Sequence, residues 1–151
     1  MVVYVDGETF GLQPLRHATK TITFTAGGAG LNAAVTDVFT VTGEVEVIAL
    51  VPFCVTSLEQ DAGTPKLMLG TPTDPDLFIN LTTATLIDAG NFWTWANPSF
   101  PMFLLADRLK EAVLSEKIVC EVGNTNNISA GVIRFDVYWR ALSSDGALAP
   151  A

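Results

Sequence analysis

His17 is the only histidine in the chain, so any Ser-His-Asp or Cys-His catalytic device would have to use it. It stands beside Arg16, and no nucleophile signature accompanies it. One histidine together with Cys54 and Cys120, two cysteines 66 positions apart, offers none of the ligand spacings of a zinc site. We therefore expect a surface histidine, no catalytic residue and no bound metal. The cysteines lie in apolar, strand-like runs, which predicts buried free thiols; a disulfide would require their strands to pair suitably.

Two short motifs have the outline of ligand-binding loops. Asp74-Pro75-Asp76 has the Asp-x-Asp spacing of a calcium loop, but the glycine and the distal glutamate that such loops require are missing. Gly27-Gly28-Ala29-Gly30 has the outline of a phosphate-binding loop, but no lysine and threonine follow it and no helix is expected there. A capped turn and a glycine turn account for these residues better, so we expect no cofactor.

Aromatic residues gather in a third candidate site. Trp93 and Trp95 share a strand expected from Asn91 to Trp95 and point the same way, and Phe100 and Phe103 follow closely. Aromatic pairs of this kind stack on sugar rings, anchor protein interfaces or fill a core. All three roles stay open at this point.

Composition indicates an acidic protein that assembles with other subunits. The 151 residues fit one domain, able to bury about two thirds of its unfolded surface. Hydrophobic residues make up 49% and charged residues only 16%, which indicates that other subunits cover part of the surface. The net charge of −8 argues against nucleic acid or an anionic membrane as partner. Neither a signal sequence nor a membrane-spanning run is recognisable, so we expect synthesis and assembly in a cytoplasm.

The clearest structural signal is the alternation over residues 131 to 143, which predicts a strand with one buried face. A slip of one residue would move charged side chains into the core, so the register is well specified. The residues expected in the core are Ile133, Phe135, Val137, Trp139 and Ala141.

Other runs predict further strands and few helical turns. A turn at Thr42-Gly43 separates two strands, and Val45, Val47, Ala49 and Val51 are expected to share a face. Further strands are expected near residues 19–25, 66–70, 77–81, 91–95 and 117–122. One or two helical turns are expected within 103–114, and a frayed tail from Ser144 to Ala151. About eight strands without alternating helices predict an all-β protein, an antiparallel β-sandwich.

Residues 1 to 17 are expected to form an extended N-terminal arm in front of a sandwich domain at 18–151. The arm contains apolar residues that must dock on something to leave water, and another subunit is the obvious acceptor, by strand addition to a sheet edge. Its candidate interface residues are Val2, Val3, Tyr4, Val5 and Phe10.

Three segments together resemble the small jelly-roll virion proteins of tailed bacteriophages, a group that includes capsid decoration proteins and head-fibre bases. They are residues 41–47, 72–77 and 131–143, and the likeness extends over about residues 35 to 148. Members of the group form trimers on the virion surface. The resemblance thus implies a jelly-roll fold and a homotrimer that binds the major capsid protein or another virion protein.

The expected function is non-enzymatic stabilisation of a phage head at the virion surface. The alternative is a carbohydrate-binding or receptor-binding module of a tail or head fibre, which would use Trp93 and Trp95. A hydrolytic enzyme would need paired carboxylates, and no such pair lies close in the sequence. If the arm is the tether, deletion of residues 2–16 leaves a folded domain that no longer attaches.

Overall fold

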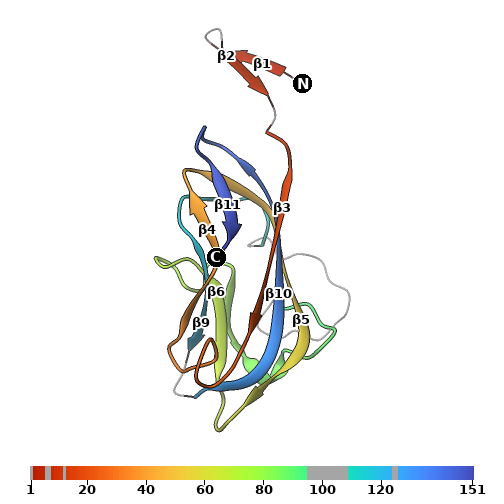
Figure 1. Cartoon of the computed structure of the whole chain (residues 1–151), viewed down its shortest axis with the longest axis vertical. Coiled ribbons are helices and arrows are strands. Elements are labelled where there is room, and N and C mark those ends of the chain that lie inside the picture. Colours follow the sequence, from red (N-terminus) through yellow and green to blue (C-terminus); the bar gives the residue numbers. More distant parts are fainter. Residues whose placement is uncertain (1, 6–7, 12, 95–108, 124–125) are drawn as a thin grey trace.

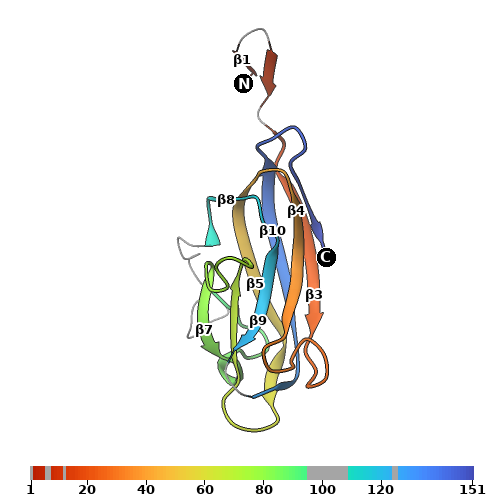
Figure 2. The same cartoon turned by 90° about the vertical axis from the view of Figure 1, so that its left-hand side faces the viewer.

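The chain folds into two antiparallel β-sheets that face each other (Figures 1 and 2). The computed structural model describes residues 2–5, 8–11, 13–94, 109–123 and 126–151. In order across the sheet, the four-stranded sheet contains β3 (Arg16–Thr23), β10 (Ile128–Ala141), β5 (Val45–Gln60) and β8 (Ala112–Leu114). The five-stranded sheet contains β11 (Ala147–Pro150), β4 (Val35–Thr42), β9 (Ile118–Gly123), β6 (Lys66–Gly70) and β7 (Ile79–Thr83). The all-β antiparallel prediction is confirmed, and the described part of the chain has nine strands in the two sheets in place of about eight.

Strand pairing follows a nested order along the chain. From β3 to β10, the first strand pairs with the last, β4 pairs with β9, β5 with β8, and β6 with β7, all antiparallel. The connections from β3 to β4, β4 to β5 and β5 to β6 each cross from one sheet to the other. The fold is therefore dominated by contacts between residues far apart in sequence.

The core lies between the sheets, and β10 contributes one complete face of it. Ile133, Phe135 and Val137 are fully buried, and Trp139 and Ala141 nearly so, which confirms the predicted alternation. Leu67 and Leu69 of β6 bury their side chains from the opposite sheet. Each fully buried side chain of this size contributes about 1.5 to 3 kcal/mol by leaving water.

A β-bulge in β5 changes which of its residues face the core. Tyr138 of β10 pairs with Ala49 and Trp139 pairs with Val47, so Ile48 is an extra residue without a partner. An extra residue shifts the period-two alternation by one position. Val45, Val47, Ala49 and Val51 were expected to share one face. Val45 and Val47 are buried, but Ala49 and Val51 face outward, and Leu50, Pro52 and Cys54 take the buried positions. The prediction for Ala49 and Val51 was wrong for this reason.

Two segments near the ends of the chain belong to the sheets, which the sequence did not indicate. The tail expected to fray contains β11, which pairs with β4 and buries Leu148. At the other end, β3 begins at Arg16, so Arg16 and His17 belong to the four-stranded sheet and not to the arm. Main-chain pairing with a neighbouring strand provides the stabilisation in both cases.

The region expected to contain helical turns is mostly outside the described residues, which leave out 95–108. Its final part, Ala112–Leu114, is the strand β8. A short 3-10 helix spans Ala84–Leu86 instead. Within the strand expected at 91–95, Phe92 makes a single β-bridge with Phe53, and the main chain of Trp93 donates to the carbonyl of Pro52 at 3.0 Å. This segment thus covers the edge of β5 beyond β8.

Candidate binding surfaces

The N-terminal segment forms a β-hairpin that stands apart from the sandwich. Strand β1 (Val2–Val5) pairs antiparallel with β2 (Glu8–Gly11), with Val3 opposite Phe10 and Tyr4 opposite Thr9. The hairpin hydrogen-bonds to neither sheet, and Figures 1 and 2 show it beyond the end of the sandwich from which β3 starts. The arm candidates Val2, Val3, Tyr4, Val5 and Phe10 therefore lie together in one two-stranded element. A two-stranded hairpin is marginally stable by itself in water, which makes this element a candidate docking segment.

Trp93, by contrast, lies in the core of the sandwich. Its side chain is fully buried, and its indole Nε1 donates to the hydroxyl of Thr82 at 2.9 Å. Its ring meets that of Phe135 edge-on, with 6.5 Å between centroids. Of the three roles left open for Trp93, the core role holds, and its indole is not available to a partner subunit or a sugar. Trp95, Phe100 and Phe103 lie outside the described residues.

A polar cluster on the outer face of the four-stranded sheet was not predicted from the sequence. His17 Nε2 lies 2.9 Å from Asp136 Oδ1, and Arg134 Nε donates to Asp136 Oδ2 at 2.8 Å. The Tyr138 ring stacks on His17 with 4.8 Å between centroids, and the Arg134 guanidinium lies over Phe53. In the sequence, Arg134, Asp136 and Tyr138 are the polar half of the β10 alternation. Only the strand register shows which residues of β3 and β5 lie beside them.

The Asp136 carboxylate is the electrostatic centre of this cluster. Partial burial alone would raise its pKa, but hydrogen bonds from Arg134 and His17 and the charge of Arg134 hold the pKa below its ordinary value. The carboxylate therefore remains ionised at neutral pH. The arrangement neutralises charge on the sheet face.

Replacing Asp136 with asparagine should lower the free energy of unfolding by about 1 kcal/mol near neutral pH. Because the folded-state pKa is depressed, the wild-type advantage is present above the unfolded pKa of about 4 and is lost as pH falls through the folded pKa. Urea unfolding of both proteins at several pH values measures this difference. Asp37→Asn, which breaks a more exposed pair with Lys117, is the matched control. It should lower the free energy of unfolding by less than Asp136→Asn does. A difference that does not change with pH would contradict this account.

Both cysteines are buried free thiols, as predicted. Burial, reinforced by the charge of Asp88, raises the pKa of Cys54 to about 11, and complete burial raises the pKa of Cys120 as well. Since the thiolate is the reactive form, burial keeps both side chains protonated at neutral pH.

The two loop motifs form ordinary turns. The hydroxyl of Thr71 accepts from the main chain of Asp74 at 3.2 Å, and the main chain of Leu77 donates to the Asp74 carbonyl at 3.1 Å. In the glycine segment, the main chains of Gly28 and Gly30 both donate to the carbonyl of Thr25. Within the described ranges, no group of three or more His, Cys, Asp or Glu side chains is placed to hold a metal ion.

Comparison with known proteins shows what the fold resembles. No protein-family model matches the chain, and no curated protein matches it significantly. Among solved structures, a chain of the "Cyanophage Pam1 capsid asymmetric unit" superposes with a TM-score of 0.52 and 14% sequence identity. The fold resembles a phage capsid component. The superposition covers 91% of this chain and 93% of the capsid chain, so it includes both sheets and not one shared motif.

The likeness to a phage capsid chain bears out the expected resemblance to phage virion proteins at the level of the fold. At 14% identity it transfers no individual residue, so the hairpin and the sheet face have to be argued from their own geometry. In the part of the chain that the structure describes, no helix is long and apolar enough to cross a membrane.

Proposed function

We propose that this chain is a non-enzymatic structural protein of a bacteriophage virion, which binds the assembled head as an oligomer and stabilises it. The observation that carries the proposal is the likeness of its fold to a phage capsid chain along nearly the full length of both. The proposed partners are copies of itself, in the homotrimer that the resemblance to phage virion proteins implies, and the major capsid protein or another virion protein. Its place is the virion surface.

The strand order supports a finer assignment, in which the sandwich is a jelly roll. A jelly roll contains eight antiparallel strands in two sheets, a common architecture of viral capsid domains. The nested pairs β3 with β10, β4 with β9, β5 with β8, and β6 with β7 give the order expected when one long hairpin rolls into a sandwich. In this assignment β11 is an additional strand on the edge of the second sheet.

Attachment through the β1–β2 hairpin is the proposed mechanism. The hairpin is connected to β3 by residues 12–15 and pairs with no other strand among the described residues, so its backbone edges remain for a neighbouring subunit. Addition of such an element to an exposed sheet edge supplies main-chain hydrogen bonds and buries apolar side chains at the same time. The marginal stability of an isolated hairpin favours the docked state.

Binding of this kind stabilises a head by mass action. A protein that binds only the assembled shell contributes RT ln(1 + [L]/Kd), about 4 kcal/mol per site at roughly a thousandfold excess over Kd. No chemical step is required, which agrees with a role without catalysis. The net charge of −8 suits a partner other than the packaged nucleic acid.

Sedimentation of the purified chain with assembled heads tests the proposal. We expect the chain to pellet with heads of the phage that encodes it and to stay in the supernatant with unassembled capsid subunits. Pelleting in proportion to added chain, up to a plateau, would indicate a defined set of sites. A chain that stays in the supernatant with heads at every concentration would refute the proposal.

A further inference from the structure

We infer that copies of this chain meet each other through the outer face of the β3–β10–β5 sheet. The inference deepens the oligomeric part of the proposed function and does not depend on attachment to a head. It rests on the register, the charge balance and the composition of this face. We call it the β10 face, and its residues are His17, Glu46, Ala49, Val51, Phe53, Arg134, Asp136, Tyr138 and Arg140.

The register arranges these residues in rows across the three strands. Tyr138 lies between His17 on β3 and Ala49 on β5, and Asp136 lies opposite Val51. Residues in register on neighbouring strands are close enough to form one continuous surface. The bulge at Ile48 is what turns Ala49 and Val51 outward, so the apolar centre of this face depends on it.

The charges of the β10 face are neutralised within the face. Asp136 accepts from Arg134 and pairs with His17, and Arg140 pairs with Glu46. Two arginines thus balance one aspartate and one glutamate, although the chain as a whole carries −8. A surface whose charges are already paired can lose water without leaving an isolated buried charge, which is the main electrostatic penalty of association.

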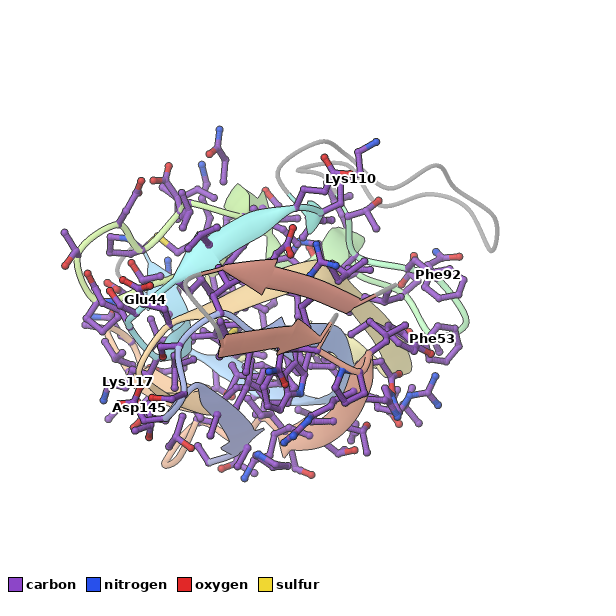
Figure 3. All side chains as sticks on the ribbon, turned by 90° about the horizontal axis from the view of Figure 1, so that it is seen from above. Glu44, Phe53, Phe92, Lys110, Lys117 and Asp145 are labelled. Carbon is purple, nitrogen blue, oxygen red and sulfur yellow. The ribbon has the colours of Figure 1, made fainter. Side chains whose placement is uncertain are left out.

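Aromatic and β-branched side chains cover the rest of the face. Tyr138 is 39% exposed, and Phe53 packs edge-on against Phe92 with 5.0 Å between centroids. Figure 3 shows Phe53 and Phe92 together on one flank of the sandwich, with Glu44 and Asp145 on the opposite flank. Tyrosine, phenylalanine and arginine are enriched in the centres of protein interfaces.

The charge distribution favours a second copy of the chain as the partner of the β10 face. Two copies of a chain with a net charge of −8 repel each other through most of their surfaces, but the β10 face can approach another copy without that repulsion. A basic partner would instead be drawn to the acidic remainder of the surface. Self-association through this face is therefore the contact that the charge distribution favours.

Sedimentation equilibrium of the full chain tests the inference. Val51→Lys puts a lysine on the β10 face opposite Asp136, and Val35→Lys puts one on the exposed start of β4 opposite Glu121, so the two variants are matched in charge, strand context and acidic neighbour. We expect the wild-type chain and Val35→Lys to self-associate equally. Val51→Lys should weaken self-association by at least about tenfold, because a buried ammonium group loses water.

Tyr138→Ser provides a second variant in case Val51→Lys does not fold, as judged by circular dichroism. It should also shift the chain toward the monomer by about tenfold or more. A wild-type chain that is monomeric at about 100 μM would overturn the inference, because a contact with a Kd above about 100 μM is too weak to hold an oligomer together. So would variants of the β10 face that associate as the wild type does. Loss of self-association with retained binding to heads, or the reverse, separates this inference from the proposed function.

Discussion

Replacing Trp93 with alanine is expected to lower the free energy of unfolding by about 3 to 5 kcal/mol, the cost of removing a large buried aromatic side chain. The indole is fully buried, donates to Thr82 and packs edge-on against Phe135, so its removal leaves a cavity between the sheets. Urea unfolding followed by tryptophan fluorescence and circular dichroism measures the effect.

Trp93→Phe is the matched control, because it keeps a ring in the core and removes the indole donor. Together with its smaller volume, the lost hydrogen bond to Thr82 should cost about 1 to 2 kcal/mol, clearly less than the alanine variant. If Trp93→Ala lost less than about 1 kcal/mol, the side chain would not fill the core, and a role at the surface would regain support.

Deleting residues 2–12 is expected to abolish attachment to heads while leaving the sandwich folded. The hairpin pairs with neither sheet, so its removal should change the free energy of unfolding by less than about 0.5 kcal/mol. Binding to heads should fall by at least about tenfold, since a docked hairpin contributes main-chain hydrogen bonds and apolar burial. Co-sedimentation and thermal unfolding of the same preparations measure the two quantities.

The boundary of this deletion matters. A deletion of 2–16 would remove Arg16, which begins β3 and lies over the ring of Trp139 at 5.3 Å, so a loss of binding could reflect damage to the sheet. Replacing residues 2–11 with a Gly/Ser segment of equal length keeps the linker. This variant tests whether binding needs the hairpin itself or only a segment of that length. Unchanged binding of both variants would contradict the role of the hairpin as a tether.

Sequence patterns predict strands well where one face is strictly apolar. The burial of β10 from Ile133 to Ala141 was predicted correctly, because period-two burial has a single compatible register. The sequence pattern could not predict the bulge at Ile48. Isoleucine fits either phase of the alternation, and the extra residue appears only when β5 pairs with β10. Strand β11 was missed for a similar reason, since Leu148 is its one large apolar residue.

The candidate surfaces depended even more on long-range pairing. His17 and Asp136 are 119 positions apart, and nothing local to either residue indicates that they meet. Trp93 shows a different limit. An aromatic residue of this kind is compatible with a core, an interface or a sugar site until its burial and its hydrogen-bond partner are known. The hairpin was expected from its apolar residues as an arm, but its pairing as β1 and β2 was not.

The amount of this chain in purified virions tests the structural role most directly. Quantitative mass spectrometry of particles from a density gradient should find the chain in the same fractions as the major capsid protein, at a constant ratio to it, and an antibody should label it on intact particles. A chain found only in the soluble fraction of the lysate, and absent from purified particles, would contradict the account.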